Sequence, residues 1–340
     1  MSELTLEDIA RKAGVSRSTV SRVINGQMHV SEATRKQVLE VIKSTGFSPN
    51  AAARTLVSQH SNTIGLVLPH SVSLFFTDPY YPHLIKGVAQ ACNDHNYTLA
   101  LFLAGNREDQ EKLYPRVSRK GLLDGVIVQS GHHGDQSLIS DLAKTNLPVV
   151  IAGRPLFEHH VSFIDIDNVG AARQAVAHLI SCGRKRIATI TGPMESAVGV
   201  DRLMGYQKAL AEAGISVDEN LVVEADFTES GGYQAMQKIL PAKPDGVFAA
   251  SDMMAIGAIR AVRDARMRVP EDIAFVGFDD LPVPQVIDFQ LTTIRQPVVQ
   301  FGYKAVETLI DIIDQEDHSV HQVNMETELI IRNTCGAQKG

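Results

Sequence analysis

The sequence predicts an all-α helix-turn-helix head followed by an α/β body of two lobes, each built on a parallel sheet. Near the start of the chain, apolar residues recur at helical spacing on both sides of a glycine turn. Further on, short apolar runs alternate with helical stretches, which is the pattern of parallel α/β sheets. The length of 340 residues also exceeds that of one domain. We therefore expect a head over residues 1–49, a hinge helix and linker over 50–61, and a body over 62–335.

The helix-turn-helix motif is predicted at the start of the head. A first helix is expected over residues 6–13, because its apolar residues recur three and four positions apart. Thr5 can act as its N-cap, with Asp8 as the capping-box partner. A glycine turn follows, and Ser16 can cap a second helix that runs to Ile24.

The second predicted helix has a polar outer face. Val20, Val23 and Ile24 recur at spacings that turn them inward. This leaves the polar side chains mostly outward: Arg17, Ser18, Thr19, Ser21 and Arg22. A helix fits the major groove of B-DNA, where an arginine can bond both O6 and N7 of guanine. These side chains are therefore candidates to read DNA, and a merely solvated helix face is the alternative.

A third helix is expected from about Glu32 to Ser44, with Ser31 as its cap and Gly46 as its stop. It would cover the first two helices with apolar residues at four positions: Ala33, Val38, Leu39 and Ile42. Three short helices of this kind make a minimal core of the size found in DNA-binding heads.

The predicted hinge contains a short segment, AAARTLVS, that Asn50 can cap. A helix of barely two turns is marginal in water, so we expect it to form only when it is supported. Leu56 would then have no core of its own, which suits insertion at a minor-groove base step. A plain linker is the alternative interpretation.

Two consecutive stretches, TLEDIARKAGVSRSTVSRVING and VSEATRKQVLEVIKSTGFSPNAAARTL, resemble the head and hinge of the lactose-repressor/galactose-repressor family. The resemblance implies DNA contacts of three kinds: bases for Arg17, Ser18 and Arg22, the backbone for Thr19, Ser21 and Asn25, and the minor groove for Ala53 and Leu56. The cap residues complete the predicted DNA-binding set: Thr5, Ser16 and Asn50.

Two series of apolar runs make up the body. The first series is TIGLVLP, YTLALFLA, DGVIVQS and PVVIAG, and the second is RIATITG, DGVFAASD and DIAFVGFDD. They join near residues 163–168, and LTTIRQP is expected to cross back to the first lobe. We predict lobe 1 at about 62–162 plus 292–322 and lobe 2 at about 163–291 plus 323–335. The resemblance extends to about Arg332 and implies a ligand-binding and dimerisation domain similar to the sugar-binding proteins of the periplasm.

Candidate effector contacts lie where predicted strands end and helices begin, because ligands of parallel sheets bind at the carboxyl ends of the strands. These residues are Asp78, Tyr80, Tyr81, Ser196, Arg202, Phe227, Asp252 and Asp279. Aromatic rings stack on sugars or bases, while arginine and carboxylates hydrogen-bond hydroxyls or ring nitrogens. The resemblance implies effector contacts at all of them except Asp78. Alternatively, Asp252 could only cap the following helix and Asp279 could only shape a loop.

The resemblance also bears on the class of effector. Purine-responsive members of the family carry other polar side chains at the positions of Ser196 and Val198. This difference favours a sugar or sugar derivative as the effector, and a purine or nucleoside is the alternative.

The head is mildly basic and the body is acidic. Residues 1–60 carry eight Lys and Arg against five Asp and Glu, a net charge of +3, so the rest of the chain carries −10 of the total of −7. DNA phosphates would attract the head and repel the body, which favours one docking orientation.

The sequence indicates no membrane span, signal peptide, disulfide or metal site. No apolar run approaches the ~20 residues that span a bilayer and the first residues are too charged for a signal peptide, so a cytoplasmic protein is expected. The three cysteines lie far apart with no CxxC pair, which indicates neither disulfides nor a zinc site. Adjacent histidines, as in His132–His133 and His159–His160, point apart on a strand. We therefore predict no metal and no cofactor.

Catalytic motifs are missing as well. The sequence holds no GxxxxGKS/T phosphate loop, no GxGxxG fingerprint and no GxSxG elbow, which argues against an enzyme. A sugar-processing enzyme with a DNA-binding head, a transport-type binding protein and a nucleoid architectural protein are the competing classes. We expect a transcriptional regulator, by default a repressor, that binds palindromic double-stranded DNA as a homodimer and responds to a small polar effector.

Overall fold

The computed structural model describes residues 4–24, 30–47, 60–68, 77–105, 107–130, 135–156, 161–282, 289–315 and 319–337. The chain divides into two compact units, Met1–Ser61 and Asn62–Gly340. They correspond to the predicted head with its hinge and to the predicted body.

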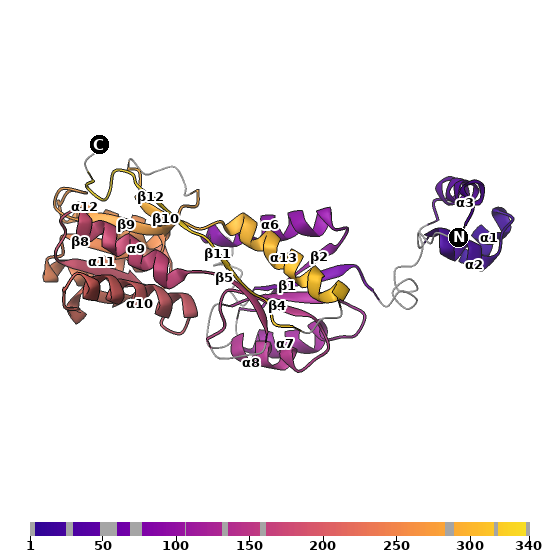
Figure 1. The fold of residues 1–340 in the computed structure, drawn as a ribbon, viewed down its shortest axis with the longest axis horizontal. Coiled ribbons are helices and arrows are strands. Elements are labelled where there is room, and N and C mark those ends of the chain that lie inside the picture. Colours follow the sequence, from indigo (N-terminus) through magenta and orange to yellow (C-terminus); the bar gives the residue numbers. More distant parts are fainter. Residues whose placement is uncertain are drawn as a thin grey trace. The chain divides into compact units, whose positions relative to one another are not determined.

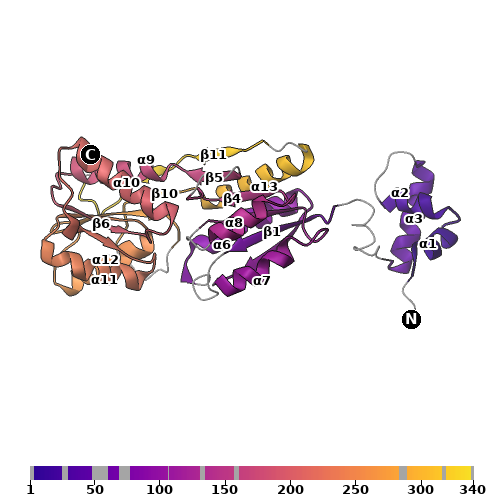
Figure 2. The same cartoon turned by 90° about the horizontal axis from the view of Figure 1, so that it is seen from below.

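The head contains the three predicted helices: α1 (Leu6–Lys12), α2 (Arg17–Ile24) and α3 (Glu32–Thr45) (Figure 2). The capping box of α1 is confirmed, because the Thr5 hydroxyl accepts from the Asp8 amide and the Asp8 carboxylate accepts from the Thr5 amide. Ser31 caps α3, and Gly46 ends it with a φ of 64° in the left-handed region that glycine favours.

The head closes around a small core, whose buried members are Ile9, Ala10, Ala13, Val20, Val23 and Val38. The prediction that Ala33 and Leu39 join this core is wrong, because Ala33 is exposed and Leu39 is 48% exposed. From α3 the inward residues are Val38 together with Val41 and Ile42, which lie three and four positions further on. Neither Ala33 nor Leu39 lies three or four positions from Val38.

The first sheet of the body has six parallel strands in the order β11-β5-β4-β3-β1-β2. Their bounds are β1 (Thr63–Leu68), β2 (Thr98–Leu103), β3 (Gly125–Gln129), β4 (Val149–Ala152), β5 (Ser162–Ile166) and β11 (Gln322–Met325). Helices α6 (Tyr80–Asp94) and α13 (Val298–Gln315) cover one face, and α7 (Arg107–Val117) and α8 (Asp135–Ala143) cover the other (Figure 1). Strands covered on both faces are continuous apolar runs, as β1, β3 and β4 are.

The second sheet has six strands in the order β12-β10-β9-β8-β6-β7, parallel except for the pair β10 and β12. Its strands are β6 (Ile187–Thr191), β7 (Val222–Glu224), β8 (Gly246–Ala249), β9 (Ala274–Asp279), β10 (Thr293–Arg295) and β12 (Glu328–Ile330). The helices pack as two pairs on opposite faces, α9 (Asn168–Ser181) with α10 (Ala197–Glu212), and α11 (Glu229–Ile239) with α12 (Asp252–Asp264). Two short 3-10 helices, Glu219–Leu221 and Leu240–Ala242, complete this lobe.

The chain passes between the lobes three times, at points that differ by a few residues from the predicted boundaries. Strand β5, which the prediction divided at residue 163, belongs to the first sheet, and so does all of β11. Strand β10, assigned to lobe 1 by the prediction, pairs with β9 in the second sheet. The reason is that backbone pairing decides which sheet holds a strand, and the apolar pattern of one strand does not reveal its partner. None of the helices in the described ranges has the length and apolar character needed to cross a bilayer.

Candidate functional site

A cavity lies between the two lobes at the carboxyl ends of their strands and encloses about 920 Å³ of empty space, including solvent at its mouth. Seven of the eight predicted effector residues line it: Asp78, Tyr80, Tyr81, Ser196, Arg202, Phe227 and Asp279. Residues that are distant in the sequence therefore meet at one site, because parallel strands direct their carboxyl ends to the same edge of each sheet.

The eighth predicted residue, Asp252, does not line this cavity. Its buried carboxylate accepts from the Asp280 amide at 2.8 Å and from the Thr293 hydroxyl at 2.6 Å. It is also not the cap of α12, because that position is taken by Ser251, whose hydroxyl accepts from the Met254 amide. Asp252 thus fixes the turn that follows β9, a role the sequence analysis missed.

Arg202 on α10 is the buried cation of the cavity and is 4% exposed. Its Nε donates to Asn168 Oδ1 at 2.9 Å and its Nη1 donates to the Ala250 carbonyl at 2.5 Å. The guanidinium lies 3.5 Å from the ring centroid of Phe278, and its Nη1 is 3.7 Å from an oxygen of Asp279. These contacts hold the planar group in one orientation, as bidentate recognition of a ligand requires.

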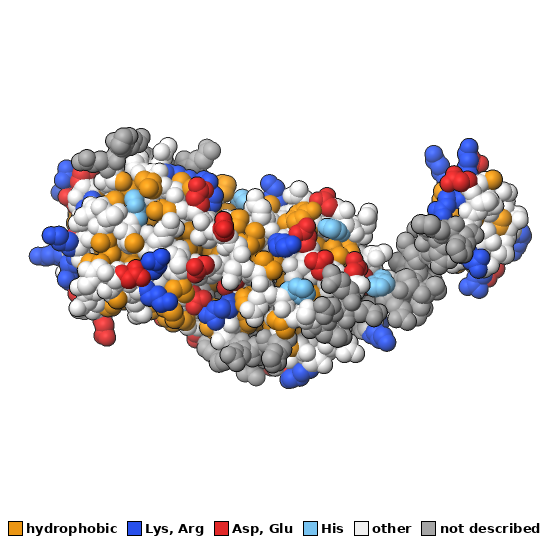
Figure 3. Space-filling model, viewed as in Figure 1, with side chains coloured by type: hydrophobic (Ala, Val, Ile, Leu, Met, Phe, Trp, Pro, Cys, Tyr) orange, Lys and Arg blue, Asp and Glu red, His pale blue; other side chains and the backbone are white. Residues whose placement is uncertain are grey.

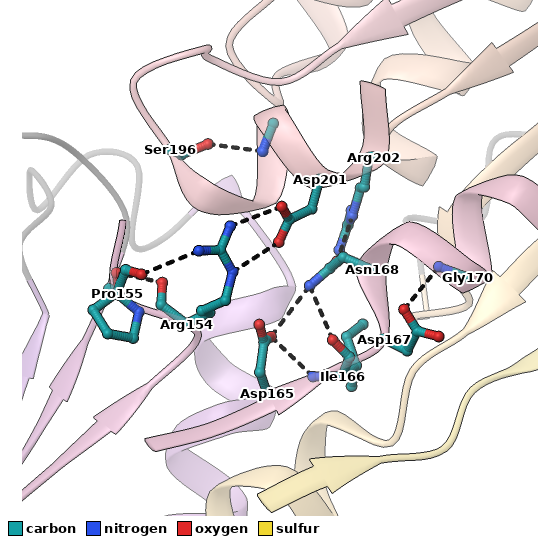
Figure 4. Close-up of polar contacts among 12 residues, drawn as sticks. Arg154, Pro155, Asp165, Ile166, Asp167, Asn168, Gly170, Ser196, Asp201 and Arg202 are labelled. Carbon is teal, nitrogen blue, oxygen red and sulfur yellow. Dashed lines mark hydrogen bonds and ion pairs between the residues drawn. The ribbon is translucent and has the colours of Figure 1, made fainter. Parts of the chain in front are cut away.

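Asp165 lies at the end of β5 beside Arg202 and Asn168 (Figure 4). Its Oδ1 accepts from the Ile166 amide at 2.8 Å and from Asn168 Nδ2 at 3.1 Å. Burial removes the carboxylate from water and raises its pKa to about 6, and the nearby Asp201 carboxylate adds to that rise. The hydrogen bonds therefore fix the position of the Asp165 carboxylate, although its negative charge is poorly solvated.

Other titratable groups of the cavity are perturbed in the same direction. Burial raises the pKa of Asp279, although the neighbouring Arg202 opposes the rise. Burial also raises the pKa of Asp78 and of the Tyr80 hydroxyl. Clefts in which several pKa values are displaced by burial are typical of binding and catalytic sites.

Several lining residues were missed by the sequence analysis, among them Gln129, Ser130, Asp165, Asn168, Asp226 and Gln296. Gln129 is 7% exposed, and its Oε1 has no hydrogen-bond partner within the described part of the chain. Gln296 Nε2 donates to Asp279 Oδ1 at 2.6 Å. All six lie within the last two residues of a strand or within two residues after it, so a search for polar residues at strand ends could have identified them.

An ion pair joins the two lobes beside the cavity (Figure 4). Arg154, which follows β4 of the first lobe, donates from Nη2 and Nε to the two carboxylate oxygens of Asp201 on α10, at 2.7 and 3.1 Å. The Asp201 side chain is 10% exposed and that of Arg154 is 37% exposed. This two-pronged contact favours the relative position of the lobes seen in the structure.

The head presents the predicted DNA-binding side chains on α2. Arg17, Ser18 and Arg22 are exposed, while Thr19 and Ser21 are half-buried. Basic side chains protrude from the surface of the head in the space-filling view (Figure 3). The outward side of α2 thus combines exposed cations with hydroxyl groups, as a DNA-reading helix does. Of these cations, Arg17 also lies 3.3 Å from a carboxylate oxygen of Glu7.

The predicted cap residues hold the head together. The Ser16 hydroxyl accepts from the Thr19 amide at 3.2 Å, as predicted for the cap of α2, and the Thr5 hydroxyl belongs to the capping box of α1. The remaining predicted DNA contacts lie outside the described residues: Asn25, Asn50, Ala53 and Leu56. The histidine pairs His132–His133 and His159–His160 also lie outside them.

Both parts of the chain match known protein families. The model of bacterial regulatory proteins of the lacI family matches residues 5–50, and that of the periplasmic binding protein-like domain matches residues 176–335. Among curated proteins, the HTH-type transcriptional regulator CelR of Thermobifida fusca is 41% identical over 97% of this chain and 98% of its own length. The HTH-type transcriptional repressor PurR of Edwardsiella ictaluri is 34% identical over 97% and 96%, respectively.

Solved structures agree with these matches. A complex of the transcriptional regulator CelR with cellobiose superposes with a TM-score of 0.77 at 38% identity, covering 97% of this chain and 99% of the other. The lac repressor dimer bound to operator and an anti-inducer superposes with a TM-score of 0.83 at 26% identity, covering 99% and 100%. The predicted fold class is thereby confirmed, and the chain belongs to the LacI family of DNA-binding transcriptional regulators.

Proposed function

We propose that the affinity of this regulator for operator DNA is controlled by a carbohydrate bound between its lobes, with the disaccharide cellobiose as the first candidate. The observation that carries the proposal is the inter-lobe cavity, where carboxylates, amides and aromatic rings surround the fixed guanidinium of Arg202. The relative CelR, which was crystallised with cellobiose, supports this choice.

The chemistry of the lining suits a neutral polyhydroxylated ligand. Carboxylates such as Asp78 and Asp165 accept hydrogen bonds from hydroxyl groups, and the Gln129 Oε1 is a buried acceptor that needs a donor. Arg202 can donate to a hydroxyl or ring oxygen in return. The rings of Tyr80 and Phe227 offer apolar surface for the C–H faces of a sugar.

The charge balance of the cavity disfavours anionic effectors. Four carboxylates line it, those of Asp78, Asp165, Asp226 and Asp279, against the one arginine at 202. A phosphate or carboxylate ligand would face repulsion in surroundings where water screens little. Nucleotides and sugar phosphates are therefore poor candidates, and a neutral purine base is the second candidate, supported by the PurR relative.

On the DNA side, we propose that two copies of the chain bind one palindromic operator and that each inserts α2 into the major groove. The lac repressor, crystallised as a dimer on its operator, supports this assembly. Arg17, Ser18 and Arg22 would contact bases. Residues 50–61 would carry the change in lobe position to the heads, with Leu56 in the minor groove. Repression in the cytoplasm, without enzymatic turnover, completes the proposal.

The test begins with isothermal titration of the purified protein against cellobiose, glucose, glucose 6-phosphate and hypoxanthine. We expect cellobiose to bind, glucose 6-phosphate not to bind, and binding to weaken strongly in Arg202→Lys, which loses the planar fork but keeps the charge. If hypoxanthine alone binds, the effector is a purine and not a carbohydrate. Binding of none of the four, or equal binding by the Arg202→Lys variant, would contradict a carbohydrate site at this cavity.

A further inference from the structure

A cluster of thiol and imidazole side chains lies in the second lobe, away from the cavity. His178 and Cys182 are one helical turn apart at the end of α9, and Cys335 lies in the segment after β12. One possible ligand atom from each of the three residues lies within 4.8 Å of the others, and His178 Nε2 is 3.7 Å from Cys182 Sγ. Sequence spacing did not predict this cluster, because only the tertiary fold brings Cys335 to α9.

Backbone interactions place the three residues independently of any ligand. The Cys182 amide donates to the His178 carbonyl at 3.0 Å, which holds both on one face of α9. The Thr334 carbonyl accepts from the Phe275 amide at 2.7 Å, which ties the segment carrying Cys335 to β9. A ligand bound by the three side chains would thus meet groups that are already held near one another.

We propose that His178, Cys182 and Cys335 bind a thiophilic divalent cation, with Zn²⁺ as the first candidate. In a tetrahedral zinc site with Zn–S near ~2.3 Å and Zn–N near ~2.0 Å, ligand atoms lie roughly 3.5–3.8 Å apart. The 3.7 Å between His178 and Cys182 already meets this spacing. Two thiolates and an imidazole select Zn²⁺ over Mg²⁺ or Ca²⁺, which prefer oxygen ligands. Three protein ligands leave the fourth position for water.

A third cysteine of the chain provides a control for this proposal. Cys92 lies on α6 of the first lobe, is 1% exposed and does not belong to the cluster. Its substitution removes a thiol from the chain and leaves the three proposed ligands in place.

The position of the cluster suggests what a bound ion would do. Helix α9 begins at Asn168, which lines the effector cavity, and ends at the cluster. A metal would join the end of this helix to the C-terminal segment and so stabilise the second lobe without contacting the effector. This site and its role do not depend on the identity of the effector.

The experiment uses the full chain, reduced and stripped of metal, and titrates it with Zn²⁺ in competition with a chromophoric chelator. We expect one equivalent of Zn²⁺ per chain, and a thiolate-to-cobalt charge-transfer band when Co²⁺ replaces it. Cys182→Ser and His178→Asn should each weaken Zn²⁺ binding at least ~100-fold, because loss of a ligand exceeds the 10–100-fold effect of losing an outer-sphere partner. The Cys92→Ser variant should bind Zn²⁺ as tightly as the chain without substitutions.

Two features keep the test decisive. Because Cys335 is buried, the test uses substitutions of Cys182 and His178, which are partly exposed. Cys92 is buried as well, so circular dichroism checks the folding of the control Cys92→Ser together with that of the two test variants. No stoichiometric Zn²⁺ uptake by the reduced chain would overturn the proposal. Uptake that survives both Cys182→Ser and His178→Asn would also overturn it, since the ion would then lie elsewhere.

Discussion

Replacing Asp165 by asparagine should stabilise the effector-free protein while weakening its binding of the effector. The carboxylate is buried at the end of β5, and its pKa is raised from 3.8 to about 6. An asparagine at this position keeps an oxygen that can accept from the Ile166 amide and from Asn168 Nδ2. The substitution therefore removes a poorly solvated charge and preserves the local hydrogen bonds.

The size of the effect follows from the displacement of the pKa. A rise of roughly two units at about 1.36 kcal/mol per unit corresponds to about 3 kcal/mol. The folded state binds the extra proton between about pH 4 and pH 6, so the free energy of unfolding falls as the pH rises through that window. Above pH 6 the full cost is present, and Asp165→Asn removes it.

Thermal unfolding of the two proteins at pH 7.5 and pH 4.5 tests this reasoning. We expect the variant to melt higher at pH 7.5, by roughly 2–4 °C for each kcal/mol, and the gain to shrink at pH 4.5. Asp167→Asn is the control, because this exposed residue caps α9 by accepting from the Gly170 amide and asparagine caps equally well. An equal gain at both pH values, or a lower melting temperature at pH 7.5, would refute the argument from buried charge.

Three further substitutions test other parts of the account. Arg202→Lys should lower effector affinity at least ~100-fold (about 3 kcal/mol) in calorimetry, because a lysine cannot keep both the bond to Asn168 and the bond to the Ala250 carbonyl. An affinity equal to that of the control Arg173→Lys, a substitution of an exposed arginine, would contradict this expectation. Arg154→Ala should increase the radius of gyration in X-ray scattering, because the ion pair between the lobes is lost. It should destabilise the body by only about 1–2 kcal/mol, because Arg154 is partly exposed. An unchanged radius would show that the ion pair does not hold the two lobes in position. Arg22→Ala should weaken operator binding by about 1–3 kcal/mol in fluorescence anisotropy at fixed salt, and an equal loss on unrelated DNA would show that Arg22 contacts only phosphates.

Local signals in the sequence were sufficient for the head. Thr5 and Ser31 cap their helices through residues three positions further on. Gly46 ends α3 through its own left-handed backbone, so the helix limits follow from short-range capping rules. Which apolar residues of α3 face inward depends on how the helix rotates against its partners. That is a tertiary property, and for this reason Leu39 was misplaced.

The effector cavity was predictable in part. A search for polar residues near strand ends led to Asp78 and Asp279, and both line the cavity because the parallel topology brings strand ends together. The same signal could not tell whether a carboxylate faces the cavity or supports a turn, and Asp252 does the latter through Thr293 and the Asp280 amide. The lobe boundaries were misplaced because strand pairing across the three crossings is a long-range property.

The central claim is that a carbohydrate in the inter-lobe cavity controls DNA affinity. The direct test selects an operator from random duplex DNA, then measures its affinity by anisotropy at fixed salt with and without saturating cellobiose. The account predicts a change of at least about tenfold (~1.4 kcal/mol of coupling), abolished in Arg202→Lys while operator binding without sugar is retained. An operator affinity that stays the same when calorimetry shows the cavity to be filled would contradict it.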